Sequence, residues 1–174
     1  MTPGVLTEMV LALSLTYVGA AQAQLTGRTE YRNEKYGLTL KYPADLFAVE
    51  RTAEGGDGQV FVTQEGDARL LVGALVNDSG FTVATYQSHL ARQSYGNYKI
   101  TYRPMGRTWF VLSGEGDGKV FYEKVMFSCS GRLINSFAMI YPASKQHVFN
   151  PIIERMENTF RPGECRAAVQ RAPD

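Results

Sequence analysis

Apolar residues stand at every second position in several short stretches of the chain, and this spacing predicts half-buried strands. The clearest case is the alternation of Leu38, Leu40 and Tyr42 with Thr39 and Lys41. Clusters of glycine and polar residues separate the stretches, which is typical of tight antiparallel hairpins. Further strands are expected at 45–50, 60–63, 98–103, 109–113, 119–129 and 132–141.

The run from Arg69 to Val76, RLLVGALV, differs from these strands because it is almost wholly apolar. Strands with this composition are usually buried on both faces. We therefore expect a central strand of the sheet with a covering layer on each side.

Two segments show helical spacing. The first is expected to start at Thr82, whose hydroxyl can accept a hydrogen bond from a free backbone N–H, and to stop at Gly96-Asn97. Phe81 can contact Tyr86 across this helix start as a hydrophobic staple. The second helix is expected at Asn150-Pro151, with asparagine as the cap and one or two helical turns before it at 143–148.

The order of these elements is several strands, a helix, four strands and a helix. Strand runs with short hairpins predict an antiparallel sheet with helices packed against it. The fold class is therefore α+β: a single layered domain over residues 30–165, with a central antiparallel β-sheet and flanking helices.

The chain has 174 residues, enough for one domain with a real core. Its 18 Lys and Arg nearly cancel its 17 Asp and Glu, so no basic field exists to attract nucleic acid. We expect no nucleic-acid partner.

The first 23 residues have the pattern of a signal peptide. A short apolar run, Met9–Val18, precedes the small residues Ala21 and Ala23, which fit the pocket of a signal peptidase. Cleavage is expected between Ala23 and Gln24, with 24–29 as a polar linker and a periplasmic or secreted product. The run is too short for stable membrane insertion.

One feature disagrees with a signal peptide: Glu8, and no Lys or Arg, precedes the run. A true start upstream would supply the missing basic residues. The alternative is a cytosolic protein with an apolar N-terminus.

Two cysteines remain after cleavage, Cys129 and Cys165, and an even count in an exported chain favours a disulfide. The bridge would fix the segment after the last helix, and residues 166–174 beyond it are expected to be disordered. The alternative is two free thiols. Two cysteines without neighbouring ligands are too few for a metal site, so no cofactor is expected.

Other residues that could bind a metal or take part in catalysis also fit ordinary structural roles. Three acidic glycine loops, 54–58, 65–67 and 115–118, contain potential calcium ligands but also the residues that tight turns require. His89 and His147 lie in no metal-binding or nucleophile pattern, although a Cys129–His147 pair remains an alternative to the disulfide. Paired carboxylates for glycoside hydrolysis cannot be recognised from sequence spacing.

One candidate binding patch stands out on the expected hairpin. Arg107 and Trp109 on one strand can lie near Tyr122 and Lys124 on the next. Aromatic and basic side chains on a sheet can bind carbohydrate, peptide or an anionic group. The alternative is packing beneath a helix with the charges reaching solvent.

The opening of the domain resembles that of the PsbP-like superfamily. The matching motif is Tyr31-x-Asn33-x-x-Tyr36-Gly37-Leu38-x-Leu40-x-Tyr42-Pro43-x-x-Leu46-Phe47, and the last helix ends in a similar Thr159-Phe160. The resemblance implies a central antiparallel sheet with flanking helices. The superfamily includes photosystem II accessory proteins, a Ran-binding nuclear import factor and bacterial envelope proteins, so it selects a fold and no single activity.

These observations favour an exported, non-catalytic binding or accessory domain of the cell envelope, whose partner is an envelope protein or a small ligand. A secreted hydrolase that uses carboxylates or a free Cys129 is the alternative. An oligomerising, structural envelope protein is a third possibility.

Overall fold

The computed structural model describes residues 28–165. The expected signal peptide with its Ala23–Gln24 cleavage site, most of the expected linker and the expected disordered tail lie outside the described residues. The described chain runs through five strands, a helix, four strands and a second helix, with short 3-10 helices at Glu54–Gly56 and Ala143–Lys145. The elements are β1 Arg28–Arg32, β2 Thr39–Pro43, β3 Phe47–Thr52, β4 Gly58–Thr63, β5 Arg69–Val76, α1 Val83–Gln93, β6 Lys99–Tyr102, β7 Trp109–Gly116, β8 Lys119–Ser128, β9 Leu133–Pro142 and α2 Gln146–Thr159.

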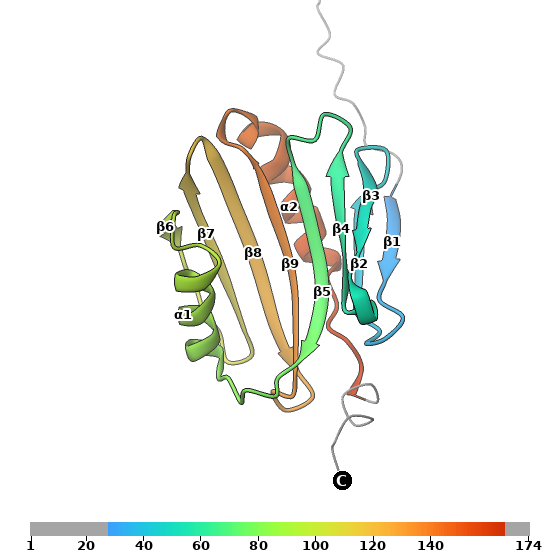
Figure 1. Cartoon of the computed structure of the whole chain (residues 1–174), viewed down its shortest axis with the longest axis vertical. Coiled ribbons are helices and arrows are strands. Elements are labelled where there is room, and N and C mark those ends of the chain that lie inside the picture. The colour runs from blue at the N-terminus through green and yellow to red at the C-terminus, as the bar shows by residue number, and fades with distance from the viewer. Residues whose placement is uncertain (1–27, 166–174) are drawn as a thin grey trace, which may run out of the picture.

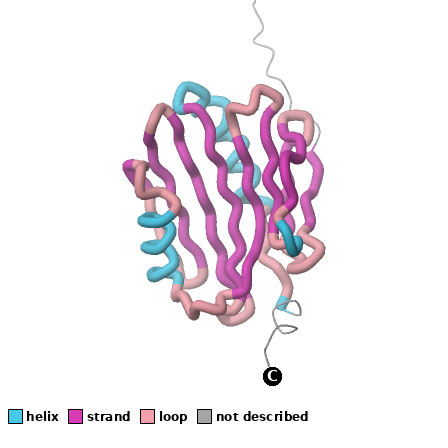
Figure 2. Tube along the Cα trace, viewed as in Figure 1, coloured by secondary structure: helices cyan, strands magenta, loops and turns pink. Residues whose placement is uncertain are grey.

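Seven strands form one antiparallel sheet in the order β3-β4-β5-β9-β8-β7-β6, and β1 and β2 form a separate two-stranded hairpin. The long strands β5, β8 and β9 lie at its centre (Figures 1 and 2). The predicted α+β fold with a central antiparallel sheet is confirmed.

One face of the large sheet is covered by α2 and the β1–β2 hairpin (Figure 1). Phe149, Ile152, Ile153 and Met156 form the buried stripe of α2, at the spacing of one helix face. They pack on alternate residues of the central strands, because side chains point to the same face of a sheet at every second position. The members contributed by the central strands include Leu70, Val72, Leu133, Phe137, Met139 and Tyr141.

The other face carries α1, which packs over β7 and β8. Thr82 caps this helix as expected, and its hydroxyl accepts a hydrogen bond from the backbone N–H of Thr85. Thr85 returns the bond through its own hydroxyl, which accepts from the N–H of Thr82. The rings of Phe81 and Tyr86 lie 5.3 Å apart, so the expected staple is also present.

Two expected boundaries were wrong. The helix α2 begins at Gln146 and continues through Pro151, because the short 3-10 turn before it already sets the chain in a helical path. The side chain of Asn150 is no cap; it accepts a hydrogen bond from the phenol of Tyr141 at 2.8 Å. Arg28 and Thr29, expected in a linker, belong to β1 because they pair with β2.

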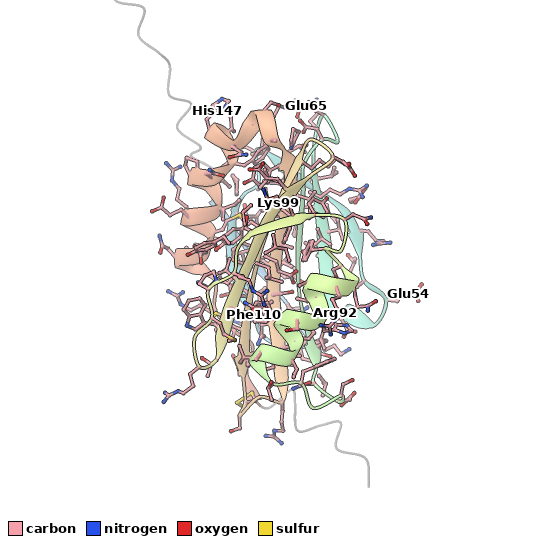
Figure 3. The ribbon with its side chains drawn as sticks, turned by 90° about the vertical axis from the view of Figure 1, so that its left-hand side faces the viewer. Glu54, Glu65, Arg92, Lys99, Phe110 and His147 are labelled. Atoms are coloured by element: carbon pink, nitrogen blue, oxygen red, sulfur yellow. A yellow bond between two sulfur atoms is a disulfide. The ribbon has the colours of Figure 1, made fainter. Side chains whose placement is uncertain are left out.

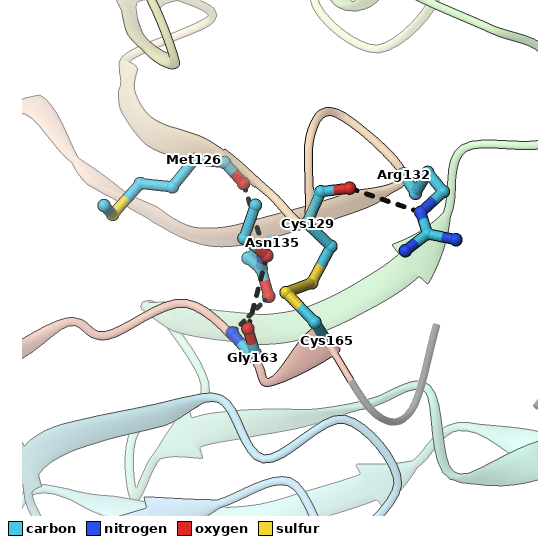
Figure 4. The surroundings of a disulfide bond; sticks show 7 residues. Met126, Cys129, Arg132, Asn135, Gly163 and Cys165 are labelled. Atoms are coloured by element: carbon cyan, nitrogen blue, oxygen red, sulfur yellow. Dashed lines mark hydrogen bonds between the residues drawn. A yellow bond between two sulfur atoms is a disulfide. The ribbon is translucent and has the colours of Figure 1, made fainter. Parts of the chain in front are cut away.

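The predicted disulfide joins Cys129 to Cys165, with the two Cα atoms 5.0 Å apart (Figure 4). Beside it, fully buried Asn135 donates to the carbonyl of Met126 and accepts from the N–H of Gly163. The bridge and this amide both attach the segment after α2 to the end of the sheet.

Candidate functional site

The face of the sheet that carries α1 is open over β4, β5 and β9 (Figure 1). Burial along β5 alternates, and the side chains of Leu71 and Leu75 are 37% and 42% exposed. The prediction that β5 is covered on both faces was therefore wrong. The physical reason is that α1, only 11 residues long, reaches β7 and β8 and leaves the next strands without a covering layer.

A groove of about 510 Å³ lies on this open face. One wall is the end of α1 with Leu90 and the residues that follow the helix, Ser94 and Tyr95. The other wall is the β3–β4 loop with Ala53 and Asp57. Figure 3 shows α1, marked by Arg92, and the loop, marked by Glu54, both projecting on the side of the sheet away from α2. We call the groove between these two walls the open-face groove.

The floor of the groove is low because small residues face each other across neighbouring strands. Gly58 of β4 pairs with Gly73 of β5, which pairs with Ser136 of β9. A Cβ atom added at Gly73 would lie 2.7 Å from the carbonyl oxygen of Asp57, so only glycine allows this approach of the two strands. Larger apolar residues surround the low centre: Val60, Leu71, Leu75 and Ile140.

A carboxyl group also lines this groove. Glu123 of β8 is 7% exposed, and its Oε2 accepts a hydrogen bond from the phenol of Tyr95 at 2.7 Å. The side chain of Ser136 gives it a second hydrogen bond. Burial raises the pKa of Glu123 to about 7, against the effect of these two hydrogen bonds, and burial also raises the pKa of Tyr95.

Sequence reasoning missed Glu123, although a signal was present. Along β8 it shares its face with Phe121, Val125 and Phe127, so the period of two places a charged residue in an apolar row. Its partners Tyr95 and Ser136 come from distant segments and carry no local signal.

Asp57 is the other carboxyl residue that lines the groove. Its Oδ1 accepts from the ammonium group of Lys35 and from the phenol of Tyr36 at 3.0 Å. Asp57 directly precedes β4, which lies three strands from β8, a separation of roughly 14 Å at ordinary strand spacing. The groove therefore does not present Asp57 and Glu123 as a pair of catalytic carboxyls.

The predicted patch lies on the opposite face, beside α2. Lys124 sits 5.6 Å from the ring centre of Trp109 and forms a 2.7 Å ion pair with Glu157 of α2. Tyr122 is part of the same cluster, and its pKa is raised by burial and by a hydrogen bond to Glu157. The ion pair engages the charge of Lys124, which makes an anion site there less favourable.

Arg107, the fourth residue of the predicted patch, is exposed in the connection before β7. A second hollow, of about 350 Å³, extends from Tyr122 between α2 and the strands β6 to β8. Its lining includes Tyr102, Glu115 and Glu154. It lacks the buried carboxyl and the apolar floor of the open-face groove.

His147 is exposed on α2, whereas several other candidate residues have structural partners. The disulfide removes the Cys129 thiol from nucleophilic chemistry, and His89 packs 5.0 Å from the ring of Phe81. Asp67, in one acidic loop, pairs with Lys145 at 2.7 Å. Within residues 28–165, no group of three or more His, Cys, Asp or Glu is placed to hold a metal ion.

No family model matches the chain, and no curated protein matches it. Solved structures do match it. The Ran-binding protein Mog1p of Saccharomyces cerevisiae superposes with a TM-score of 0.58 at 13% identity, over 81% of this chain and 98% of that one. A mutant of protein Mog1 gives a TM-score of 0.60 at 12% identity, over 82% of this chain and 100% of that one.

Cyanobacterial PsbP (CyanoP) from Synechocystis sp. PCC 6803 superposes with a TM-score of 0.56 at 14% identity, over 86% of this chain and 97% of that one. No helix in the described part of the chain has the length and apolar character needed to cross a membrane. The superposition covers almost the full length of Mog1p and of CyanoP, and it shows that this chain shares their fold.

Proposed function

We propose that this protein is an exported, non-catalytic binding domain of the cell envelope that holds its ligand in the open-face groove. The observation that carries the proposal is the groove itself, where exposed Leu71 and Leu75 flank a low floor with a buried carboxyl at one side. Apolar hollows with a few convergent polar groups are the usual form of binding sites.

Two further observations support a binding role rather than hydrolysis. Glu123 has no second carboxyl placed beside it in the described groove, and Cys129 is held in a disulfide. A structural neighbour is by its name a Ran-binding protein, so the fold elsewhere serves to bind a partner. At 13% identity that likeness concerns the fold and not the partner.

Export is supported by the signal-like residues 1–23 and by the Cys129–Cys165 bridge, because disulfides persist in oxidising compartments. The test is the intact mass of the protein from its native host, with alkylation before and after reduction. We expect a chain that begins at Gln24 with no alkylation before reduction. A full-length chain with two alkylated cysteines would contradict export.

The binding role is tested by native mass spectrometry of the protein purified gently from its host. We expect a bound component on the wild type that is lost in Leu71→Asp, because a charge on the groove floor opposes apolar contact. Val148→Asp is the matched control, since Val148 is 42% exposed but lies on α2, on the opposite face. A bare wild type, or an equal loss in both variants, would contradict the proposed site.

A further inference from the structure

We infer that the open-face groove takes a small organic cation with an apolar body, whose ammonium group pairs with the carboxylate of Glu123. This inference rests on the proposed function and adds the chemical class of the ligand. It follows from the charges that line the groove, from the partners of Glu123 and from the size of the hollow.

The charge lining the groove has one sign. Its ionisable residues other than tyrosine are Asp57 and Glu123, and no Lys, Arg or His is among the described lining residues. Arg69 stands on the same face of β5, but its guanidinium is paired with Glu50 at 2.8 Å. An anionic ligand would meet a carboxylate without a compensating base, whereas a cation would complete the charge pair.

The partners of Glu123 are neutral. Several other acids of the described chain pair with bases, among them Asp67 with Lys145 and Glu157 with Lys124. Glu123, the most buried of the charged side chains, receives hydrogen bonds only from the hydroxyls of Tyr95 and Ser136. A carboxylate offers about four lone-pair sites, so two hydroxyls orient it and leave acceptor capacity for a ligand.

Among the described residues, no positive group faces Glu123 from the elements packed around it. The α1 side contributes the phenols of Tyr86 and Tyr95, and the neighbouring strands place Leu112 and Ala138 opposite it. A bound ammonium would therefore supply the compensating charge that the described residues do not. Its charge-assisted hydrogen bond would be stronger than those from neutral donors.

The hollow fits a small molecule. A volume of about 510 Å³ lies within the range of small-ligand sites, roughly 300–1,000 Å³. Val60, Leu71 and Ile140 line it with apolar surface that can cover a hydrocarbon body. The ligand class is thus an amine whose head reaches Glu123 and whose body lies along β4, β5 and β9.

The test compares three probes that share one hydrocarbon chain: n-octylamine, n-octanol and n-octanoate. Backbone amide signals of Leu71, Gly73 and Ala138 report binding in the groove by NMR, and calorimetry gives the affinities. The wild type, Glu123→Gln and Glu154→Gln are measured at about pH 8, where the carboxyl of Glu123 is ionised. Glu154 is exposed on α2, on the opposite face, and serves as the matched control.

We expect the amine to bind the wild type and the control variant about 10- to 100-fold more tightly than octanoate, the range of a charged hydrogen bond. Glu123→Gln should lose this preference while its affinity for octanol changes little. At about pH 6, protonation of Glu123 should weaken amine binding to the wild type but leave Glu123→Gln unaffected.

Two outcomes separate this inference from the proposed function. Suppose that octanol shifts the groove signals but the amine binds the wild type no more tightly than octanoate, or that Glu123→Gln still prefers the amine. Either result overturns the inference, while the groove remains a binding site. If none of the probes shifts these signals, a small-molecule role of the groove fails together with the inference.

Discussion

At the scale of single residues, Glu123 is the most unusual side chain of the described structure. It lies in an apolar row of β8 between Phe121 and Val125, where the ionised form loses most of its hydration. Hydrogen bonds from Tyr95 and Ser136 favour the ionised form but do not offset burial, and the pKa is raised to about 7. The folded protein therefore holds a proton at a pH where the unfolded chain is ionised.

This raised pKa predicts a dependence of stability on pH with a definite sign. The contribution of Glu123 is most favourable below the unfolded pKa of 4.5 and falls as pH rises toward the folded value of about 7. The total change is on the order of 3 kcal/mol. We expect the free energy of unfolding of the wild type to decline over this window relative to that of Glu123→Gln, as measured by urea denaturation at a series of pH values.

Asp67 acts with the opposite sign, because its hydrogen bond to Lys145 lowers its pKa and adds stability as pH rises. Both proteins contain Asp67, so the difference between their curves isolates Glu123. Parallel curves for the wild type and the variant would show that Glu123 titrates as it does in the unfolded chain.

At the scale of elements, β5 shows what a hydrophobic pattern can and cannot predict. The apolar run correctly predicted a strand near the centre of the sheet. Its prediction of burial on both faces was wrong, because an apolar strand face has the same sequence pattern whether or not a layer covers it. One face of β5 is exposed because of where α1 lies. The position of α1 is set by its packing on β7, which is distant from β5 in the sequence.

Local signals at helix ends were more informative, because capping involves residues only three or four positions apart. Thr82 and the Phe81–Tyr86 contact were predicted from the sequence and are present. The start of α2 was missed because Asn150-Pro151 resembles a cap locally, while the preceding 3-10 turn had already begun the helical path.

The cap of α1 makes a prediction at this scale. Thr82→Ala removes the acceptor for the N–H of Thr85, and we expect a loss of about 1 kcal/mol in the free energy of unfolding. Ser88→Ala, in the interior of the same helix, is the control and should change stability by less than about 0.5 kcal/mol. Equal effects of the two changes, measured by urea denaturation, would mean that the cap adds nothing specific.

At the scale of the whole molecule, the fold was predictable and the site was not. Short-range periodicity, turns and the order of elements are enough to indicate an antiparallel sheet with flanking helices. The open-face groove combines the end of α1, the β3–β4 loop and four strands, so no single segment carries its signature. The predicted patch relied on neighbouring strands alone and could not include Glu157 of α2, which engages Lys124.

The Cys129–Cys165 bridge acts on the whole molecule because the 36-residue separation it spans contains β9 and α2. Strand β9 lies at the centre of the large sheet, and α2 supplies much of the larger core. Closing a loop of this length restricts the unfolded chain by about 3–4 kcal/mol in the chain-entropy account.

We therefore expect the double variant Cys129→Ala/Cys165→Ala to melt about 10 °C below the wild type in a thermal unfolding experiment. Reductant should lower the melting temperature of the wild type by a similar amount and leave that of the double variant unchanged. Equal melting temperatures with and without the bridge would mean that Asn135 and the packing of α2 alone fix the C-terminal segment. Binding of the groove probes should survive in the double variant below its melting temperature, because the bridge lies outside the residues that line the groove.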